Sequence, residues 1–202
     1  MVRLVLRVVG FELKGLAAIG LWILRRRHGV PEGAAVATYA REQAFVLTLF
    51  AFAMAVETVV IDLLLVGLDV PAWLRFGVLI ADLYGLLFVA VMAAGCATRP
   101  HVVTREELHI RYGVYFELRV PRERIVAVRS SRSLNEDGMV SVKDGRLVVA
   151  VSSRTNVTVE LDGPVTVVRP LGRRAEVSSI RFFADSPEVM LAALRAEEAT
   201  HS

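Results

Sequence analysis

Two long apolar segments lie close together near the middle of the chain, at about residues 45–67 and 73–96. Each has the length of a helix that crosses a bilayer core, which takes about 20 predominantly apolar residues. The short connection between them contains Gly67 and Pro71, two residue types that favour a chain reversal. The pattern therefore predicts a transmembrane helical hairpin within residues 44–98.

The segment before the hairpin, residues 1–43, begins with an amphipathic pattern over residues 2–27. Arg3, Arg7 and Lys14 recur at steps of four and seven, and apolar side chains fill much of the remaining surface. Such a helix is typical of the membrane interface. A third membrane-spanning helix is the alternative, although charges in lipid are costly.

From residue 99 onward apolar and polar residues alternate, which is the pattern of half-buried β-strands. We expect about seven strands, with a tight turn at Asp162–Gly163 and a closing helix that begins near Asp185. The predicted strands fall at about residues 108–112, 116–120, 124–131, 147–151, 157–161, 164–169 and 177–183.

A sheet of this size has exposed edges, and closing it into a barrel removes them. The expected fold class is therefore a membrane α-helical hairpin followed by an α+β domain at residues 99–196. We expect that domain to be a seven-stranded antiparallel barrel capped by its C-terminal helix, with a short tail at residues 197–202.

Charge predicts the orientation in the membrane. Basic residues near the spans favour the cytoplasmic side. Here they flank the hairpin and are missing from its connecting loop, so both termini are expected in the cytoplasm. The residues are Arg25, Arg26, Arg27 and Arg41 before the hairpin, and Arg99 and Arg105 after it.

The amino-acid composition indicates a cellular location. Cys96 is the single cysteine, so an internal disulfide is excluded. Lysine occurs only at Lys14 and Lys143, and a strong preference for arginine is associated with GC-rich genomes. We therefore expect a multi-pass protein of a bacterial inner membrane.

Four charged residues interrupt the apolar segments: Glu57, Asp62, Arg75 and Asp82. Charges within a span are candidates for function because they are costly in lipid. Counted from the turn at about 1.5 Å per residue, Glu57 and Asp82 fall at similar depth, as in a proton- or cation-handling pair. Protonated or hydrogen-bonded carboxyls are the alternative. We expect Asp62 and Arg75 to form an ion pair.

Small residues recur on one face of the second span, at Gly77, Ala81 and Gly85. Small side chains let membrane helices approach closely. The stripe predicts packing within the hairpin or between copies of the chain, whereas a generally alanine-rich composition is the alternative.

A second group of candidates lies in the β-rich part, at Arg122, Arg124, Arg129 and Arg132. Near a bilayer such residues attract anionic head groups, at about 1 kcal/mol each; a solvated, salt-bridged surface is the alternative. The group is short and lacks stacking aromatics, so no nucleic-acid binding is expected.

His101 and His109 are expected at the surface. No cysteine or acidic set accompanies them, so no metal or other cofactor is predicted. No catalytic motif is recognised, and the chain is expected not to be an enzyme.

The segment LHIRYGVYFELRVPRERIVAV, residues 108–128, and the helix start DSPEVMLAAL, residues 185–194, carry a resemblance. They resemble the bacterial pleckstrin-homology-like domain of small integral membrane proteins. The resemblance implies a binding or scaffolding role at a membrane and supplies no catalytic residues.

The leading hypothesis is a non-enzymatic membrane protein that presents this domain to a protein partner or to the membrane surface. The alternative is a subunit of an oligomeric channel, transporter or membrane enzyme that uses the intramembrane carboxylates. The expected partners are the bilayer, a membrane or cytoplasmic protein, and further copies of the chain.

Overall fold

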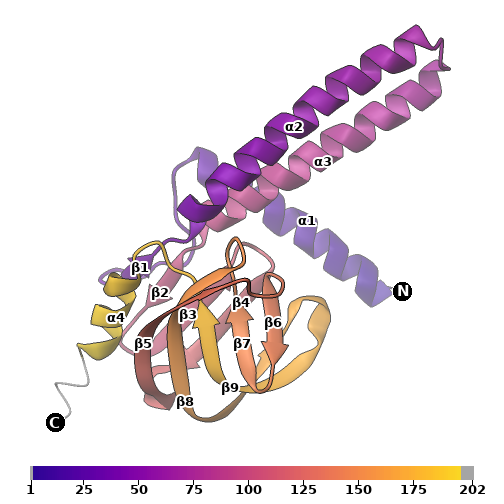
Figure 1. Cartoon of the computed structure of the whole chain (residues 1–202). Coiled ribbons are helices and arrows are strands. Elements are labelled where there is room, and N and C mark those ends of the chain that lie inside the picture. Colours follow the sequence, from indigo (N-terminus) through magenta and orange to yellow (C-terminus); the bar gives the residue numbers. More distant parts are fainter. Residues whose placement is uncertain (1, 197–202) are drawn as a thin grey trace.

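The computed structural model describes residues 2–196. Two long helices, α2 (Ala40–Gly67) and α3 (Ala72–Thr98), form a hairpin that projects from a domain rich in strands (Figure 1). Both are long and apolar enough to cross a membrane. The predicted tail at residues 197–202 lies outside the described residues, as do the side chains of Arg3 and Arg7.

The turn of the hairpin uses the residues that the sequence indicated. The backbone N–H groups of Leu68 and Asp69 donate to the Leu64 and Val66 carbonyls, which ends α2. Pro71 directly precedes α3, where its restricted φ suits a helix start. The predicted helical hairpin therefore has the expected boundaries to within a few residues.

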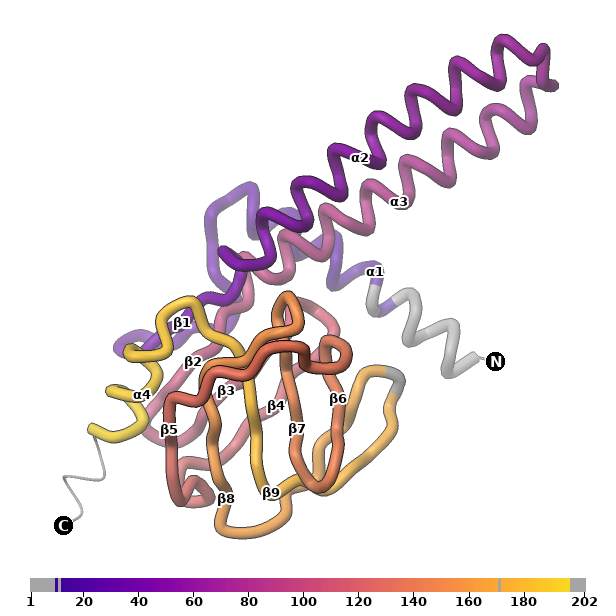
Figure 2. Tube along the Cα trace, viewed as in Figure 1, coloured from indigo at the N-terminus to yellow at the C-terminus, as the bar shows by residue number. Residues whose placement is uncertain are grey.

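The N-terminal helix α1 (Val2–Ile23) crosses the base of the hairpin obliquely instead of extending it (Figure 2). The Tyr84 hydroxyl donates to the Glu12 carboxylate across 2.6 Å. Further along, a Cβ on Gly15 would lie 2.6 Å from the Val91 side chain, so glycine permits this close approach. Within residues 2–196, α1 is not among the helices apolar enough to cross a membrane.

The strands form two sheets. The first is antiparallel, with its strands in chain order: β1 (Ala35–Ala37), β2 (His101–Val103), β3 (Glu107–Tyr112) and β4 (Phe116–Pro121). The second follows the order β5 (Ile125–Leu134), β8 (Arg154–Val168), β9 (Arg174–Phe182), β7 (Arg146–Val149) and β6 (Val140–Lys143). The β7–β9 pair is parallel, and the other neighbouring strands are antiparallel.

This arrangement corrects two expectations. The predicted seven-stranded closed barrel is not confirmed, because the strands divide between sheets of four and five. The predicted turn at Asp162–Gly163 is wrong, since both residues lie inside β8. A two-residue type I′ hairpin turn requires positive φ at both central residues, and neither residue has it. The chain bulges there, and β8 continues along β9 on both sides.

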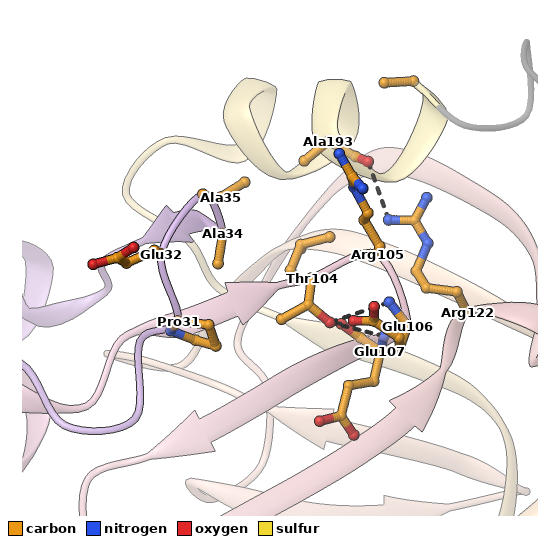
Figure 3. A pocket seen from close by; sticks show the side chains of 13 residues that line it. Pro31, Glu32, Ala34, Ala35, Thr104, Arg105, Glu106, Glu107, Arg122 and Ala193 are labelled. Atoms are coloured by element: carbon orange, nitrogen blue, oxygen red, sulfur yellow. Dashed lines mark hydrogen bonds between the residues drawn. The ribbon is translucent and has the colours of Figure 1, made fainter.

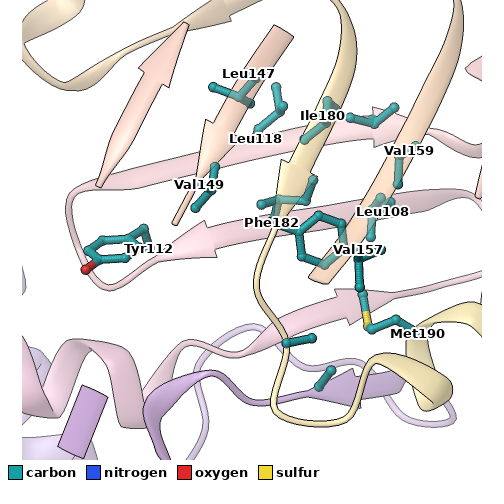
Figure 4. Packing of buried hydrophobic residues seen from close by; sticks show 14 of the residues in the cluster. Leu108, Tyr112, Leu118, Leu147, Val149, Val157, Val159, Ile180, Phe182 and Met190 are labelled. Carbon is teal, nitrogen blue, oxygen red and sulfur yellow. The ribbon is translucent and has the colours of Figure 1, made fainter. Parts of the chain in front are cut away.

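One hydrophobic core lies between the two sheets (Figure 4). Leu108 from the first sheet and Ile180 and Phe182 from the second are fully buried in it. The closing helix α4 (Pro187–Arg195) adds Met190, also fully buried, and contacts β1 and β5. The predicted C-terminal helix is thus confirmed, and it covers an end of the space between the sheets.

Strand β1 was not indicated by the sequence, yet it links the two parts of the molecule. It precedes α2 and pairs with β2, which follows α3, with Ala35 opposite Val103 and Ala37 opposite His101. The hairpin is therefore inserted between two neighbouring strands of one sheet. Both chain connections leave the domain from adjacent positions.

The end of α3 also lies very close to the β3–β4 turn. A Cβ on Gly95 would lie 3.3 Å from both the Gly113 Cα and the Val114 nitrogen, which are backbone atoms.

We expect Gly95→Ala to lower the unfolding temperature in detergent, despite the helix propensity of alanine. The matched control is Gly20→Ala in α1, where nothing lies within 4 Å, and which should be neutral or stabilising by up to about 1 kcal/mol. Equal behaviour of the two variants would contradict the close packing.

Candidate functional site

Buried polar groups gather where the hairpin meets the sheets. Tyr39, at the start of α2, is fully buried. Its hydroxyl donates to the Arg99 carbonyl across 3.0 Å and accepts the Gly113 N–H across 2.7 Å. Burial raises the pKa of Tyr39 well above its usual value, so the hydroxyl keeps the proton that it donates. One side chain thereby joins the beginning of α2, the end of α3 and the β3–β4 turn.

Gln43 continues this junction one turn into α2. Its side-chain oxygen accepts the Tyr112 hydroxyl across 3.2 Å and the Cys96 thiol across 3.5 Å. All three side chains are buried. Burial raises the pKa of Tyr112 to about 12, which keeps that hydroxyl a donor. A buried polar network of this kind is stabilising because its members satisfy one another.

Asp185 closes the junction from the other end of the chain. Its carboxylate accepts the Thr38 hydroxyl across 2.7 Å and the Arg41 N–H across 3.3 Å, and its own N–H donates to the Thr38 carbonyl. A carboxylate at a helix N-terminus satisfies free N–H groups and complements the helix dipole. Asp185 therefore stabilises the first turn of α2, in addition to preceding α4 as the sequence predicted.

Arg111 connects the segment after α1 to β3. The guanidinium is buried and donates to the His28 and Gly29 carbonyls across 3.0 and 3.2 Å. It also donates to Nδ1 of His109, and Glu117 lies 3.7 Å away. Gly29 has φ +59, and a Cβ there would lie 2.9 Å from the guanidinium, so glycine is needed for this contact.

The expectation that His101 and His109 lie at the surface is wrong. His109 donates from Nε2 to Glu107 across 2.6 Å and is only 7% exposed. His101 is 1% exposed, donates from Nε2 to the Phe183 carbonyl and accepts the Arg111 N–H at Nδ1. Desolvation lowers the pKa of His101 to about 4, so it is a neutral structural group.

The hairpin contains the predicted ion pair. The Arg75 guanidinium donates to both carboxylate oxygens of Asp62, across 2.6 and 3.0 Å. This bidentate geometry is the favourable one for an arginine and a carboxylate. It fixes α2 to α3 near the turn, as expected.

Glu57 and Asp82 lie at the same level of the hairpin. Met54 lies against Gly85 on one side of them, and Asp62 pairs with Arg75 on the other. Asp82 is half-buried, whereas Glu57 is exposed. Neither carboxylate forms a hydrogen bond or ion pair with the described part of the chain. The structure thus brings them to one depth without joining them.

The small-residue stripe divides into two parts. A Cβ on Gly85 would lie 2.6 Å from the Met54 methyl group, so this residue allows α2 and α3 to pack closely. Gly77 and Ala81 are exposed, and nothing lies within 4 Å of a Cβ built on Gly77. That part of the stripe faces away from α2.

The basic residues of the β-domain do not form one free surface. Arg122 donates to the Ala193 and Leu194 carbonyls at the end of α4. Arg124 pairs with Asp162 across 2.6 Å, and Arg129 pairs with Glu160 across 2.7 Å. Arg132 is exposed. These contacts favour the salt-bridged alternative over a cluster dedicated to head groups.

A hollow of about 540 Å³ lies between β1, the β2–β3 turn and the end of α4. Arg105 and Arg122 extend toward α4 there, while Glu32, Glu106 and Glu107 also line it (Figure 3). Its mixed charges select no ligand. Within residues 2–196, no three His, Cys, Asp or Glu side chains gather in a way that could hold a metal ion.

The sequence pattern did not indicate the junction residues, because they lie outside the apolar runs. Tyr39 and Gln43 stand directly before the first apolar run, and Thr98 and Arg99 end the second. Polar side chains are common at both ends of apolar spans. Their presence in the sequence therefore does not indicate that they contact one another.

No family model, no curated protein and no solved structure matches the chain.

The buried His101 predicts a pH-dependent stability. Its pKa is about 4 in the folded chain, against 6.5 for an unperturbed histidine. The unfolded state therefore binds the proton first, and stability is lost as the pH falls from 6.5 toward 4. At pH 5 the loss is about 2 kcal/mol. Unfolding in detergent at pH 7.5 and pH 5 measures it. His101→Gln should be less stable but should lack this part of the pH dependence; an unchanged dependence would contradict the assignment.

The Asp62–Arg75 pair predicts an unequal response to single and double substitution. Asp62→Leu leaves a guanidinium unpaired beside an apolar helix, so the unfolding temperature should fall. Asp62→Leu with Arg75→Leu removes both charges and should recover much of the loss, because no unpaired charge is then left on the apolar surface of the hairpin. Thermal unfolding in detergent gives the comparison. Additive losses would show that the two side chains do not interact.

Proposed function

We propose that the chain is a non-enzymatic integral membrane protein that uses α2 and α3 to hold its β-domain beside a bilayer. The observation that carries the proposal is the exposure of the hairpin. In the most hydrophobic 18-residue window of α2 no residue is buried, and in that of α3 only 11% are. So large an apolar surface is unfavourable in water, whereas lipid provides the matching solvent for two fully hydrogen-bonded helices.

The distribution of arginine supports a cytoplasmic β-domain. Arg25, Arg26, Arg27, Arg41, Arg99 and Arg105 flank the hairpin in the sequence, whereas the loop at residues 68–71 has no Lys or Arg. By the positive-inside rule the loop crosses to the outer side and both termini stay in the cytoplasm. The preference for arginine over lysine favours a bacterial inner membrane.

The β-domain is proposed to be a pleckstrin-homology-like module that binds a protein partner or the membrane surface. Two packed sheets followed by a C-terminal helix are consistent with the resemblance carried by residues 108–128 and 185–194. The network of Tyr39, Gln43 and Asp185 keeps the module in a fixed orientation to the hairpin. A fixed orientation suits a scaffold, because it presents the same face to the cytoplasm in every copy.

Two reporter cysteines test this layout. Asp69→Cys lies in the hairpin loop and Asp137→Cys in an exposed loop of the β-domain, while the native Cys96 is buried. In right-side-out vesicles a membrane-impermeant thiol reagent should label only the first variant. In inverted vesicles it should label only the second. Labelling of both sites from one side would exclude the hairpin as a membrane span.

A second candidate function has its own supporting observation. Glu57 is exposed midway along α2 with no partner in the described residues, and Gly77 and Ala81 on α3 face away from α2. A carboxylate facing lipid is costly, so a second copy or another membrane helix would cover it favourably. The assembly would be an oligomeric channel, transporter or membrane enzyme that uses Glu57 and Asp82.

This candidate predicts a loss of ion movement. Glu57→Gln and Asp82→Asn, alone and together, should reduce proton or cation flux in vesicles that contain the purified protein. The control is Glu188→Gln, an acidic residue in the first turn of α4 and outside the two apolar helices. Unchanged flux with an unchanged oligomer would leave the scaffold as the function.

A further inference from the structure

We propose that the base of the hairpin contains a binding site for one anionic phospholipid. Its phosphate would lie at Arg25, Arg26 and Arg27, and one acyl chain would lie in a crevice between α2 and α3. The inference rests on the proposed function, because it requires these helices to be in a bilayer.

The acyl part of the site is an apolar hollow of about 380 Å³ between α2 and α3, lined also by Trp22 of α1. This volume falls in the range of small-molecule pockets. Half of its twelve lining residues are alanines, and larger apolar side chains such as Leu47, Leu86 and Val89 complete its walls. The alanines are Ala40, Ala44 and Ala51 on α2 and Ala90, Ala93 and Ala97 on α3. Because alanine side chains are small, they leave space between α2 and α3 at this end of the hairpin.

The length of the crevice matches one leaflet. From Ala40 to Ala51 a helix rises about 16 Å, at about 1.5 Å per residue. Half of a hydrocarbon core about 30 Å thick is of the same size. A chain lying in the crevice would therefore run from the head-group level to the middle of the bilayer.

The head-group part is a second hollow of about 480 Å³, lined by Trp22, Ile23, Ala97, Thr98 and the three arginines Arg25, Arg26 and Arg27. The two hollows share Trp22 and Ala97. The two hollows therefore adjoin, with the apolar one beside the cationic one. This is the order of parts in a phospholipid.

The charges of the site select an anion. Neither hollow is lined by an aspartate or a glutamate. None of the three guanidinium groups forms an ion pair with the described part of the chain. Elsewhere exposed arginines such as Arg129 and Arg154 do pair, with Glu160 and Glu42. A phosphate would supply the missing partner, and basic pockets beside membrane helices on the cytoplasmic side are suited to lipid head groups.

The backbone fixes the arginines in place. Arg25 has φ +54, a conformation that glycine normally supplies at the end of a helix. The Arg26 N–H donates to the Leu21 carbonyl, and the His28 N–H donates to the Thr98 carbonyl across 2.8 Å. The turn therefore lies against the end of α3 instead of continuing α1. Arginines also complement the negative ends of α1 and α3, but that role does not require an apolar crevice beginning at the same tryptophan.

The test is a lipid titration of the full chain in detergent, followed by native mass spectrometry, with phosphatidylglycerol and phosphatidylcholine as probes. Phosphatidylglycerol should bind more tightly by roughly two orders of magnitude, the effect of about three basic residues near an anionic lipid. Arg25→Gln/Arg26→Gln/Arg27→Gln should abolish the preference. The matched control, Arg146→Gln/Arg173→Gln/Arg174→Gln, removes the same charge from exposed positions of the β-domain and should keep it.

The crevice is tested separately. Ala93→Leu and, from the opposite helix, Ala44→Leu fill it and should weaken phosphatidylglycerol binding by about tenfold. Ala53→Leu, which adds the same bulk to the outer surface of α2, should not. Tight binding in the filled variants would contradict the placement of an acyl chain in the crevice. An equal loss of phosphatidylglycerol preference in the β-domain arginine control would contradict a site at Arg25, Arg26 and Arg27. Displacement of the lipid by inorganic phosphate would also contradict a phospholipid site.

Retention of the protein in vesicles after an alkaline carbonate wash separates this inference from the proposed function. Release from the vesicles would refute the membrane hairpin itself. Retention without a lipid preference would refute only the phospholipid site.

Discussion

The pairing of β1 with β2 is the constraint on which the rest of this structure depends. These two short strands enclose the whole hairpin in the sequence, and they are neighbours in one sheet. Because β1 leads almost directly into α2 and α3 leads almost directly into β2, the sheet determines where α2 begins and where α3 ends. Tyr39 and Gln43 then fill the space between the two helix ends with satisfied polar groups. The long hairpin consequently behaves as an extension of the β-domain and not as a flexible tether.

The β-domain and the hairpin place their apolar side chains in opposite ways. The β-domain buries its apolar residues between two sheets and under α4, and it presents charged pairs such as Arg129–Glu160 outward. The hairpin does the reverse, with its apolar side chains outside and its strongest polar contact, Asp62–Arg75, between the helices. Between these regimes lies a layer of buried hydrogen bonds, with Arg111 and His101 as its members in the sheet. Such a layer separates the β-domain, whose apolar side chains lie inside, from the hairpin, whose apolar side chains lie outside.

Sequence patterns were informative where a period is repeated over many residues. The two apolar segments, the strands near Leu108 and Phe116, and the helix after Asp185 were therefore predicted correctly. The patterns failed where an element is short or where its role depends on a distant partner. Three-residue strands such as β1 show no alternation, and the Asp162–Gly163 bulge uses residues that equally suit a turn. The Asp62–Arg75 pair was predictable because a hairpin fixes its register, whereas the burial of His101 depends on Phe183, far away in the sequence.

The late position of Asp185 has a consequence for biogenesis. The first turn of α2 is completed by a carboxylate that is synthesised more than a hundred residues later, and β1 must wait for the end of the hairpin before its partner strand exists. A ribosome makes about 5–20 residues per second, so α2 enters its final environment many seconds before its N-terminus is fully satisfied. In the proposed membrane topology, insertion of the hairpin would accordingly precede closure of the β-domain. In that topology, the pairing of β1 with β2 would be completed only in a chain whose hairpin is already inserted.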